Sequence, residues 1–306
     1  MTGSAVRRGA PLGAVGLVIA ALASQEVGAS IAVLLFPQAG AAGMVMLRLV
    51  FSAIVLLLIA RPRIRGMSAR DWGRVALYGA ALAVMNITFY QAIARIDLGA
   101  AVTIEVLGPL ILSVVVARRA SAWLWALLAF AGVAVLGWGG FERLDPIGVL
   151  FALAAAASWA GFILASAKVG TSFPGLQGLA LGMSVGALIS LPLGILDAGA
   201  ALLQPHILGL GLAVAMLSSA IPYALELTAL RRLSASAFSV LMSLAPAMAT
   251  LAGVVLLGQL IGWIEGIGIA LVIVASIGAV LAAGRAQAEV APVTGPIELP
   301  PQAEGP

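Results

Sequence analysis

Residues 103–110 read TIEVLGPL, and this stretch and its counterpart LAPA at 244–247 decide the fold. Glu105 is a single charged residue in an apolar run, and Pro109 follows it one helical turn later. Because proline has no N–H group, the carbonyl of residue 105 loses its helical hydrogen bond and the helix is expected to break. Aligning LGPL with LAPA, at an offset of 137, predicts a second break at Pro246.

The composition around these two stretches is that of a membrane protein. Of the 306 residues, 62% are hydrophobic and only 9% are charged. Apolar runs of about 18–25 residues recur along the chain, and about 20 such residues cross a bilayer as a helix. The runs lack the alternation of a transmembrane barrel. We therefore predict an all-α polytopic membrane protein with ten transmembrane helices, at 12–36, 42–60, 73–94, 98–117, 121–140, 147–168, 176–197, 207–229, 234–257 and 260–283.

The two halves of the chain are predicted to repeat each other. Aligning SQEVG (24–28) with SWAGF (158–162) pairs the first spans of the halves. This alignment predicts two five-helix repeats, at 12–140 and 147–283. Because each repeat has an odd number of spans, the second repeat enters the membrane in the opposite orientation. Inverted repeats with broken central helices are typical of secondary transporters. The N-terminus 1–11 precedes the repeats, and a Pro-, Gly- and Ala-rich tail, 284–306, is predicted to be disordered.

Basic residues predict the orientation of the chain. With the N-terminus inside, the inner connections and tails hold 13 Lys and Arg residues and the outer connections hold 2. Short cytoplasmic loops carry such an excess, so both termini are predicted to be cytoplasmic. The bias also accounts for the net charge of +4 without a nucleic-acid partner. The basic connection between Arg61 and Arg74 suits anionic membrane lipids.

Several chemistries are excluded by what the sequence lacks. There is no cysteine, and His206 is the one histidine, so neither a disulfide framework nor a metal site of the Cys or His type is expected. No P-loop, G-x-S-x-G or H-E-x-x-H motif occurs. We expect no cofactor, no metal and no enzymatic activity, and any transport must use an ion gradient.

Ionisable residues within predicted spans mark the candidate site, because each costs roughly 2.5–3.5 kcal/mol on insertion. Glu105 lies about 10 Å below the outer end of its span at a rise of about 1.5 Å per residue. Its carboxylate and the free carbonyl could accept hydrogen bonds from an ammonium group, or the carboxylate could carry a proton. The alternative is an ion pair with Arg48 at similar depth. Arg48 is interpreted as structural, with binding of a substrate carboxylate as the alternative.

Other polar groups are predicted to line the same space. Gln25 and Glu26 form part of a polar turn in ASQEVGAS, which is hard to hide from lipid. Asn86 and Tyr90 form a polar patch in MNITFYQ. For both groups the alternative is hydrogen bonding between packed helices.

The stretch IPYALE, residues 221–226, adds a further pair. Tyr223 and Glu226 share one helix face, and Pro222 frees the carbonyl of Ser218. We predict that Tyr223 and Glu226 also face the cavity. The alternative for Glu226 is contact with the basic residues just beyond the span.

Small residues spaced by four positions predict close helix packing. Gly178, Gly182 and Gly186 form such a ridge. Packing within the molecule is the favoured interpretation, and a homodimer is the alternative.

Four stretches carry a resemblance to a known family: GASIAVLLFPQAGAAGMVMLRLVFSAIVLL, LGAAVTIEVLGPL, SSAIPYALELTALRRLSASAFSVLMSLAPA and VVLLGQ. They resemble the EamA-type drug/metabolite transporter superfamily and, within it, the threonine/homoserine exporters of bacterial inner membranes. The likeness covers roughly 12–283. It implies export of small amino acids driven by the proton gradient. That group carries glutamates where Ala245 and Gln259 stand.

Together these features predict a secondary transporter that works by alternating access. The expected partners are a small-molecule substrate, protons and membrane lipids, with Glu105 and Glu26 binding the amine or exchanging a proton. Two alternatives remain at this point. One is a broader metabolite or drug exporter, and the other is a non-transporting scaffold or lipid-acting membrane protein.

Overall fold

The computed structural model describes residues 12–117, 120–138, 145–230, 232–233 and 235–290, and within these ranges the chain is helical with no strand. This confirms the predicted all-α class. The helices are α1 (Leu12–Ala60), α2 (Ala69–Ile93), α3 (Leu98–Glu105), α4 (Leu107–Ala117), α5 (Ala120–Trp138), α6 (Pro146–Gly170), α7 (Gln177–Ala198), η1 (Gly199–Leu203), α8 (Pro205–Ala215), η2 (Met216–Ala220), α9 (Ile221–Leu230), α10 (Ala235–Met242), α11 (Ala245–Leu257) and α12 (Trp263–Val290).

Helix α1 consists of two helices joined at Gly40, whose φ of 67° and ψ of 164° are not helical. The second part needs partners for its first amide groups, which have none inside a helix. Asp197, at the end of α7, supplies one oxygen. It accepts hydrogen bonds from the amides of Ala42 at 2.8 Å and Gly43 at 3.4 Å. The predicted spans 12–36 and 42–60 thus run on either side of a turn capped by a distant carboxylate.

The two prolines of the repeat lie beside helix breaks. α3 ends at Glu105 and α4 begins at Leu107, two residues before Pro109. α10 ends at Met242 and α11 begins at Ala245, one residue before Pro246. Glu105 and Met242 are partners at the offset of 137 that aligns LGPL with LAPA. The helix ends therefore follow the alignment.

A third irregularity interrupts the predicted span 207–229. There the chain forms α8, the π-helical segment η2 and α9, with Pro222 in the first turn of α9. A π-helical turn widens a helix locally and is frequent at functional sites. The Ser218 carbonyl, four residues before Pro222, thus becomes available to another partner.

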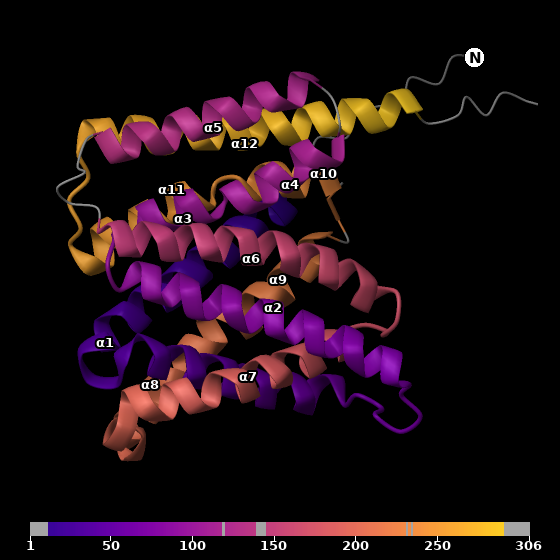
Figure 1. Ribbon diagram of the computed structural model, residues 1–306, viewed down its shortest axis with the longest axis vertical. Coiled ribbons are helices and arrows are strands. Elements are labelled where there is room, and N and C mark those ends of the chain that lie inside the picture. The colour runs from indigo at the N-terminus through magenta and orange to yellow at the C-terminus, as the bar shows by residue number, and fades with distance from the viewer. Residues whose placement is uncertain (1–11, 118–119, 139–144, 231, 234, 291–306) are drawn as a thin grey trace, which may run out of the picture.

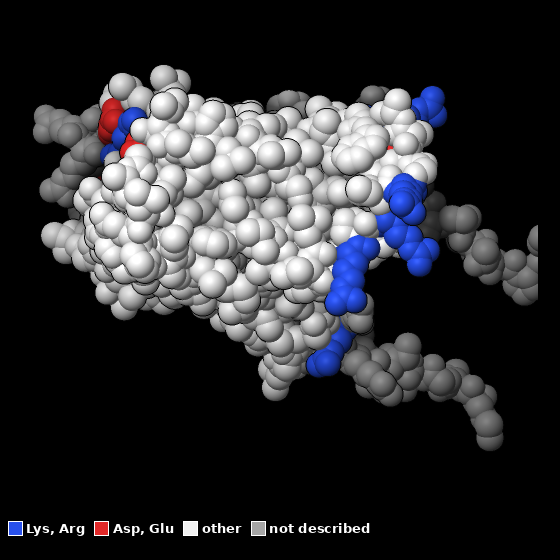
Figure 2. Space-filling model, turned by 90° about the horizontal axis from the view of Figure 1, so that it is seen from below, with Lys and Arg blue, Asp and Glu red and all other residues white. Residues whose placement is uncertain are grey.

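The surface is that of a membrane-embedded molecule. Among the described residues, eight helical segments are long and apolar enough to cross a bilayer, and α5 contains a shorter apolar segment, Trp123–Leu136. Large apolar side chains such as Leu58, Val116 and Leu196 are exposed. In Figure 2 the visible face is uncharged over its broad middle, with Lys and Arg at one end and both signs at the other.

The helices stack as a series of pairs (Figure 1). α5 and α12 pack together at one end of the stack, α3 lies against α11, and α2 lies against α6. Long α1 contacts α7, α8 and α9. The glycine ridge of α7 packs inside the molecule, because Gly182 lies against the Tyr78 ring and Gly186 against Leu82. Internal packing by these glycines is confirmed.

Helix α12 is longer than predicted. It continues to Val290, into the segment from 284 for which disorder was predicted. The sequence GRAQAE is rich in good helix formers, which explains the extension. Residues 291–306 and 1–11 lie outside the described residues.

Candidate functional site

A cavity of about 270 Å³ lies among α1, α2, α3, α6, α9, α10 and α11. It brings together all the predicted polar site residues except Tyr90, and it also includes Arg48. Residues from both halves of the chain line it. They are Gln25, Glu26, Ala29, Arg48, Met85, Asn86, Phe89, Val102, Glu105, Trp159, Phe162, Tyr223, Glu226, Met242 and Ala245.

Glu26 is the most enclosed carboxylate of this cavity, with 2% of its surface exposed. Within the described part of the chain, its Oε2 has no hydrogen-bond partner. Its backbone carbonyl accepts from the Ser30 hydroxyl at 2.9 Å. A buried polar atom without a partner is rare in proteins and calls for an explanation. A proton or a ligand ammonium group would satisfy this oxygen.

Glu105 lines the cavity from the last position of α3. The carboxyl end of a helix carries a partial negative charge, which favours a cation nearby. Broken helices whose carbonyl ends face a central site are the usual cation sites of secondary transporters. Glu105 therefore adds a full charge to a place that the backbone already makes negative.

Arg48 lies in the cavity wall and is bonded only to neutral groups. Its guanidinium donates to the Ser218 carbonyl at 3.1 Å, to the Ser219 hydroxyl at 3.4 Å and to the Tyr90 hydroxyl at 3.4 Å. Among the described residues, no carboxylate lies within 4.0 Å of it. The alternative of a direct ion pair with Glu105 is therefore not what the structure shows.

Asn86 and Tyr90 differ in where they lie. Asn86 lines the cavity, and its amide donates to the Leu82 carbonyl of its own helix at 2.8 Å. Tyr90 is fully buried beside the cavity and contacts two residues that line it, Phe89 and Arg48, whose guanidinium also lies 5.5 Å from the Tyr90 ring centre. Tyr90 thus accepts a hydrogen bond from Arg48, which lines the cavity, but Tyr90 does not line the cavity itself.

Tyr223 and Glu226 lie on α9 and both face the cavity, as their spacing predicted. Glu226 therefore lines the cavity and does not lie only at the membrane surface. Of its two candidate partners, Arg231 lies outside the described residues, and Arg232 is exposed and forms no ion pair with Glu226 within 4.0 Å. Pro222 is buried and places the freed Ser218 carbonyl against Arg48.

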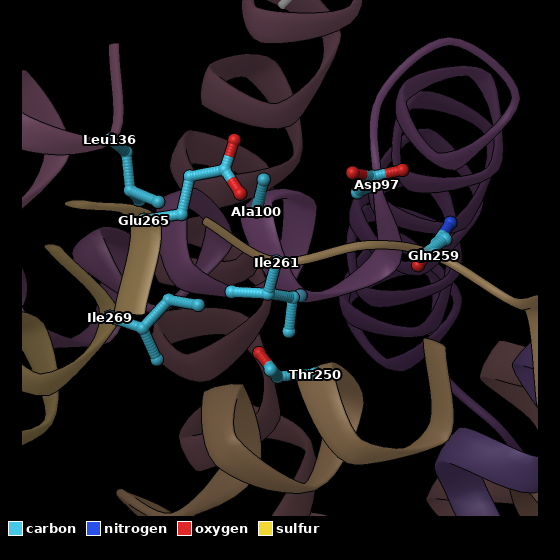
Figure 3. A pocket seen from close by; sticks show the side chains of 9 residues that line it. Asp97, Ala100, Leu136, Thr250, Gln259, Ile261, Glu265 and Ile269 are labelled. Atoms are coloured by element: carbon cyan, nitrogen blue, oxygen red, sulfur yellow. The ribbon is translucent and has the colours of Figure 1, made fainter. Parts of the chain in front are cut away.

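The described residues also enclose two smaller spaces. A neighbouring, mostly apolar cavity of about 240 Å³ lies beyond Trp159 and Met242, which line both spaces. A pocket of about 40 Å³ lies near the start of α3, with the carboxyl groups of Asp97 and Glu265 on different sides of it (Figure 3). There Gln259 accepts from the Leu98 amide at 3.2 Å. This small pocket contains none of the predicted site residues.

Sequence reasoning missed three contributors. Trp159 lines the cavity from α6 and was not among the predicted site residues. Ser219 accepts a hydrogen bond from Arg48 and belongs to no recognisable sequence motif. Asp197 caps the second part of α1, and its position after an apolar span was the one available signal. Tertiary packing brings each of them into place, so spacing along the chain could not reveal them.

The fold and the site define a class: helical membrane proteins with a polar cavity between broken helices. The EamA-like transporter family model matches residues 146–281. The threonine/homoserine exporter RhtA of Escherichia coli K12 is 37% identical over 267 residues, covering 87% of this chain and 90% of that protein. The chain belongs to the EamA-like transporter family.

Further relatives agree with this assignment. RhtA of Salmonella typhimurium LT2 is 36% identical over 88% of this chain and 92% of that protein. The uncharacterized transporter YvbV of Bacillus subtilis is 28% identical over 47% of this chain. A solved crystal structure with 20% identity has a TM-score of 0.57 and covers 90% of this chain and 98% of its own, which shows a shared fold. The named relatives are transporters and not enzymes.

Proposed function

We propose that this protein is a secondary active transporter that exports small amino acids, of the threonine and homoserine type, across the bacterial inner membrane. The observation that carries the proposal is the central cavity, which gathers Glu26, Glu105 and Glu226 from both halves of the chain. Carboxylates in a bundle interior are costly and mark substrate or proton pathways. The name of the RhtA relatives, threonine/homoserine exporter, supports the choice of substrate.

The proposal includes ten spans in two inverted repeats, 12–140 and 147–283. Three findings support this division. α1 is two helices joined at Gly40, which raises the number of spans it provides. The broken helices end at positions that the repeat alignment pairs. The family model matches 146–281, nearly the same range as the second repeat.

Orientation and mechanism follow from charge and symmetry. The end of the molecule rich in Lys and Arg (Figure 2) would face the cytoplasm. Both termini would lie on the cytoplasmic side. The two repeats would alternate in opening the cavity to either side. Glu105 and Glu26 would bind the substrate ammonium group in one state and a proton in the other. Outward transport would then be coupled to inward proton flow.

The test measures efflux of labelled threonine and homoserine from cells that express the wild type or Glu105→Gln. Losing a charge-assisted hydrogen bond costs about 1.5–3 kcal/mol, so efflux should fall by about ten- to a hundredfold. Glu265→Gln is the matched control, since Glu265 caps a helix start at the small outer pocket and should leave efflux unchanged. Equal efflux from Glu105→Gln and wild type would remove Glu105 from the mechanism.

A second candidate function is a broader metabolite exporter of the same family. The favouring observation is Ala245, which lines the cavity where the threonine/homoserine group carries a glutamate. Gln259 is the other position where that group carries a glutamate. It lies outside the cavity, where its side-chain oxygen accepts from the first amide of α3. A resistance screen with toxic amino-acid analogues and cationic dyes separates the two functions. Protection against dyes alone would favour the broader exporter.

A further inference from the structure

Arg48 is a cation whose partners in the central cavity are all neutral. An arginine side chain has several N–H donors in a planar fork that matches a carboxylate. Here two of its three hydrogen bonds are 3.4 Å long, against a usual length of about 2.9–3.0 Å. Only the bond to the Ser218 carbonyl, at 3.1 Å, approaches that length. The donors of this guanidinium are therefore incompletely used.

The surroundings make a charged partner favourable. An enclosed charge is stable when it is paired or fully hydrogen-bonded. Within the residues that the structure describes, no carboxylate oxygen lies within 4.0 Å of the Arg48 side-chain nitrogens. Its guanidinium nevertheless lines the cavity, where a ligand can reach it. The position offers an unused fork of donors to an anion that enters the cavity.

We propose that Arg48 binds the carboxylate group of an α-amino acid substrate in the central cavity. The proposal rests on the amino-acid export argued above and defines the chemistry that the cavity selects. A carboxylate would form two parallel hydrogen bonds with the guanidinium, stronger than those to neutral acceptors. Arg48 is thus a binding residue in addition to its contacts with η2 and Tyr90.

Carboxylates in the same cavity can bind the other charged group of the substrate. Glu26 and Glu105 line the cavity together with Arg48. The ammonium group of an amino acid can bind at these carboxylates while its carboxylate binds Arg48. The guanidinium would repel a simple cation, and the carboxylates would repel a simple anion. A zwitterion satisfies both groups at once.

The experiment compares two ligands that differ only at the carboxylate. Purified wild-type protein in detergent is titrated with L-threonine and with L-threoninamide, in which a neutral amide replaces the carboxylate. We expect threonine to bind at least about tenfold more tightly, since one charge-assisted pair is lost with the amide. In Arg48→Gln the two ligands should bind equally. Arg48→Lys keeps the charge without the fork and should retain part of the discrimination.

Arg95→Gln is the matched control, because Arg95 lies outside the cavity beside Asp145 and should leave the discrimination intact. Equal affinity of wild type for the two ligands would overturn the proposal, and this comparison needs no variant to fold. Undiminished discrimination in Arg48→Gln would also overturn it. Failure of the proposed function looks different: wild-type cells would then export neither threonine nor homoserine. Export without discrimination between the ligands would contradict the role of Arg48 alone.

Discussion

Gly108, between Glu105 and Pro109, is expected to tolerate no side chain. A Cβ atom at this position would overlap the backbone carbonyl of Ala156 in α6. The obstacle is main chain in the middle of a helix, so no side-chain rotation can relieve it. Gly108→Ala must therefore push α4 away from α6, beside the cavity.

The cost can be worked from two opposing effects. Overpacking typically costs about 1–3 kcal/mol, and a backbone obstacle places this site at the upper end of that range. Alanine is more favourable than glycine in a helix by about 1 kcal/mol, which offsets part of this cost. We expect a net loss of about 2 kcal/mol for Gly108→Ala. Gly161→Ala is the matched control on α6, because no atom lies within 4 Å of its added Cβ.

The assay is thermal unfolding of purified variants in detergent, combined with threonine efflux. Gly108→Ala should unfold at a lower temperature than the wild type, while Gly161→Ala should unfold at the same or a higher temperature. Efflux should fall in Gly108→Ala, because α4 carries the break beside Glu105. If Gly108→Ala proves as stable as Gly161→Ala, the close approach of α4 to α6 is refuted.

Two further substitutions test the same framework by thermal unfolding. Asp197→Ala removes the oxygen that accepts from the amides of Ala42 and Gly43, and it should cost about 0.5–2 kcal/mol as the loss of a helix cap. Asp197→Asn keeps an acceptor and should lose less; equal losses would mean that capping is not the reason. Ser276→Ala removes a buried hydroxyl without a partner among the described residues and should change stability by less than about 0.5 kcal/mol or raise it. A larger loss would reveal a partner for that hydroxyl.

The all-helical class, the apolar segments and the two helix breaks could be predicted because they depend on local properties. Apolar length sets the spans, and the missing N–H of Pro109 and Pro246 sets the breaks. The two helices of α1 were expected as separate spans, and the structure joins them at Gly40 by a turn that Asp197 caps. That contact joins residues far apart in the chain, so no local rule contains it.

The sequence predicted most of the polar residues that line the cavity, but not how their side chains pair. Residue counting placed Arg48 and Glu105 at similar depth, which suggested an ion pair. Depth says nothing of how each helix is rotated about its axis, and packing decides that. In the structure, the wider turn of η2 offers the Ser218 carbonyl to Arg48. The guanidinium is thus drawn to a neutral acceptor and kept available to the cavity.

The two broken helices differ in the side chains that they place at the cavity. Both broken helices end at it, and the alignment pairs Glu105 with Met242, which both line it. Identical ends would present the same charge to a substrate from either side and could not orient it. On the proposed function, a carboxylate at one break and a thioether at the other would favour the ammonium group at the first break over the second. With Arg48 binding the carboxylate group, as proposed, one orientation of a zwitterion would be favoured.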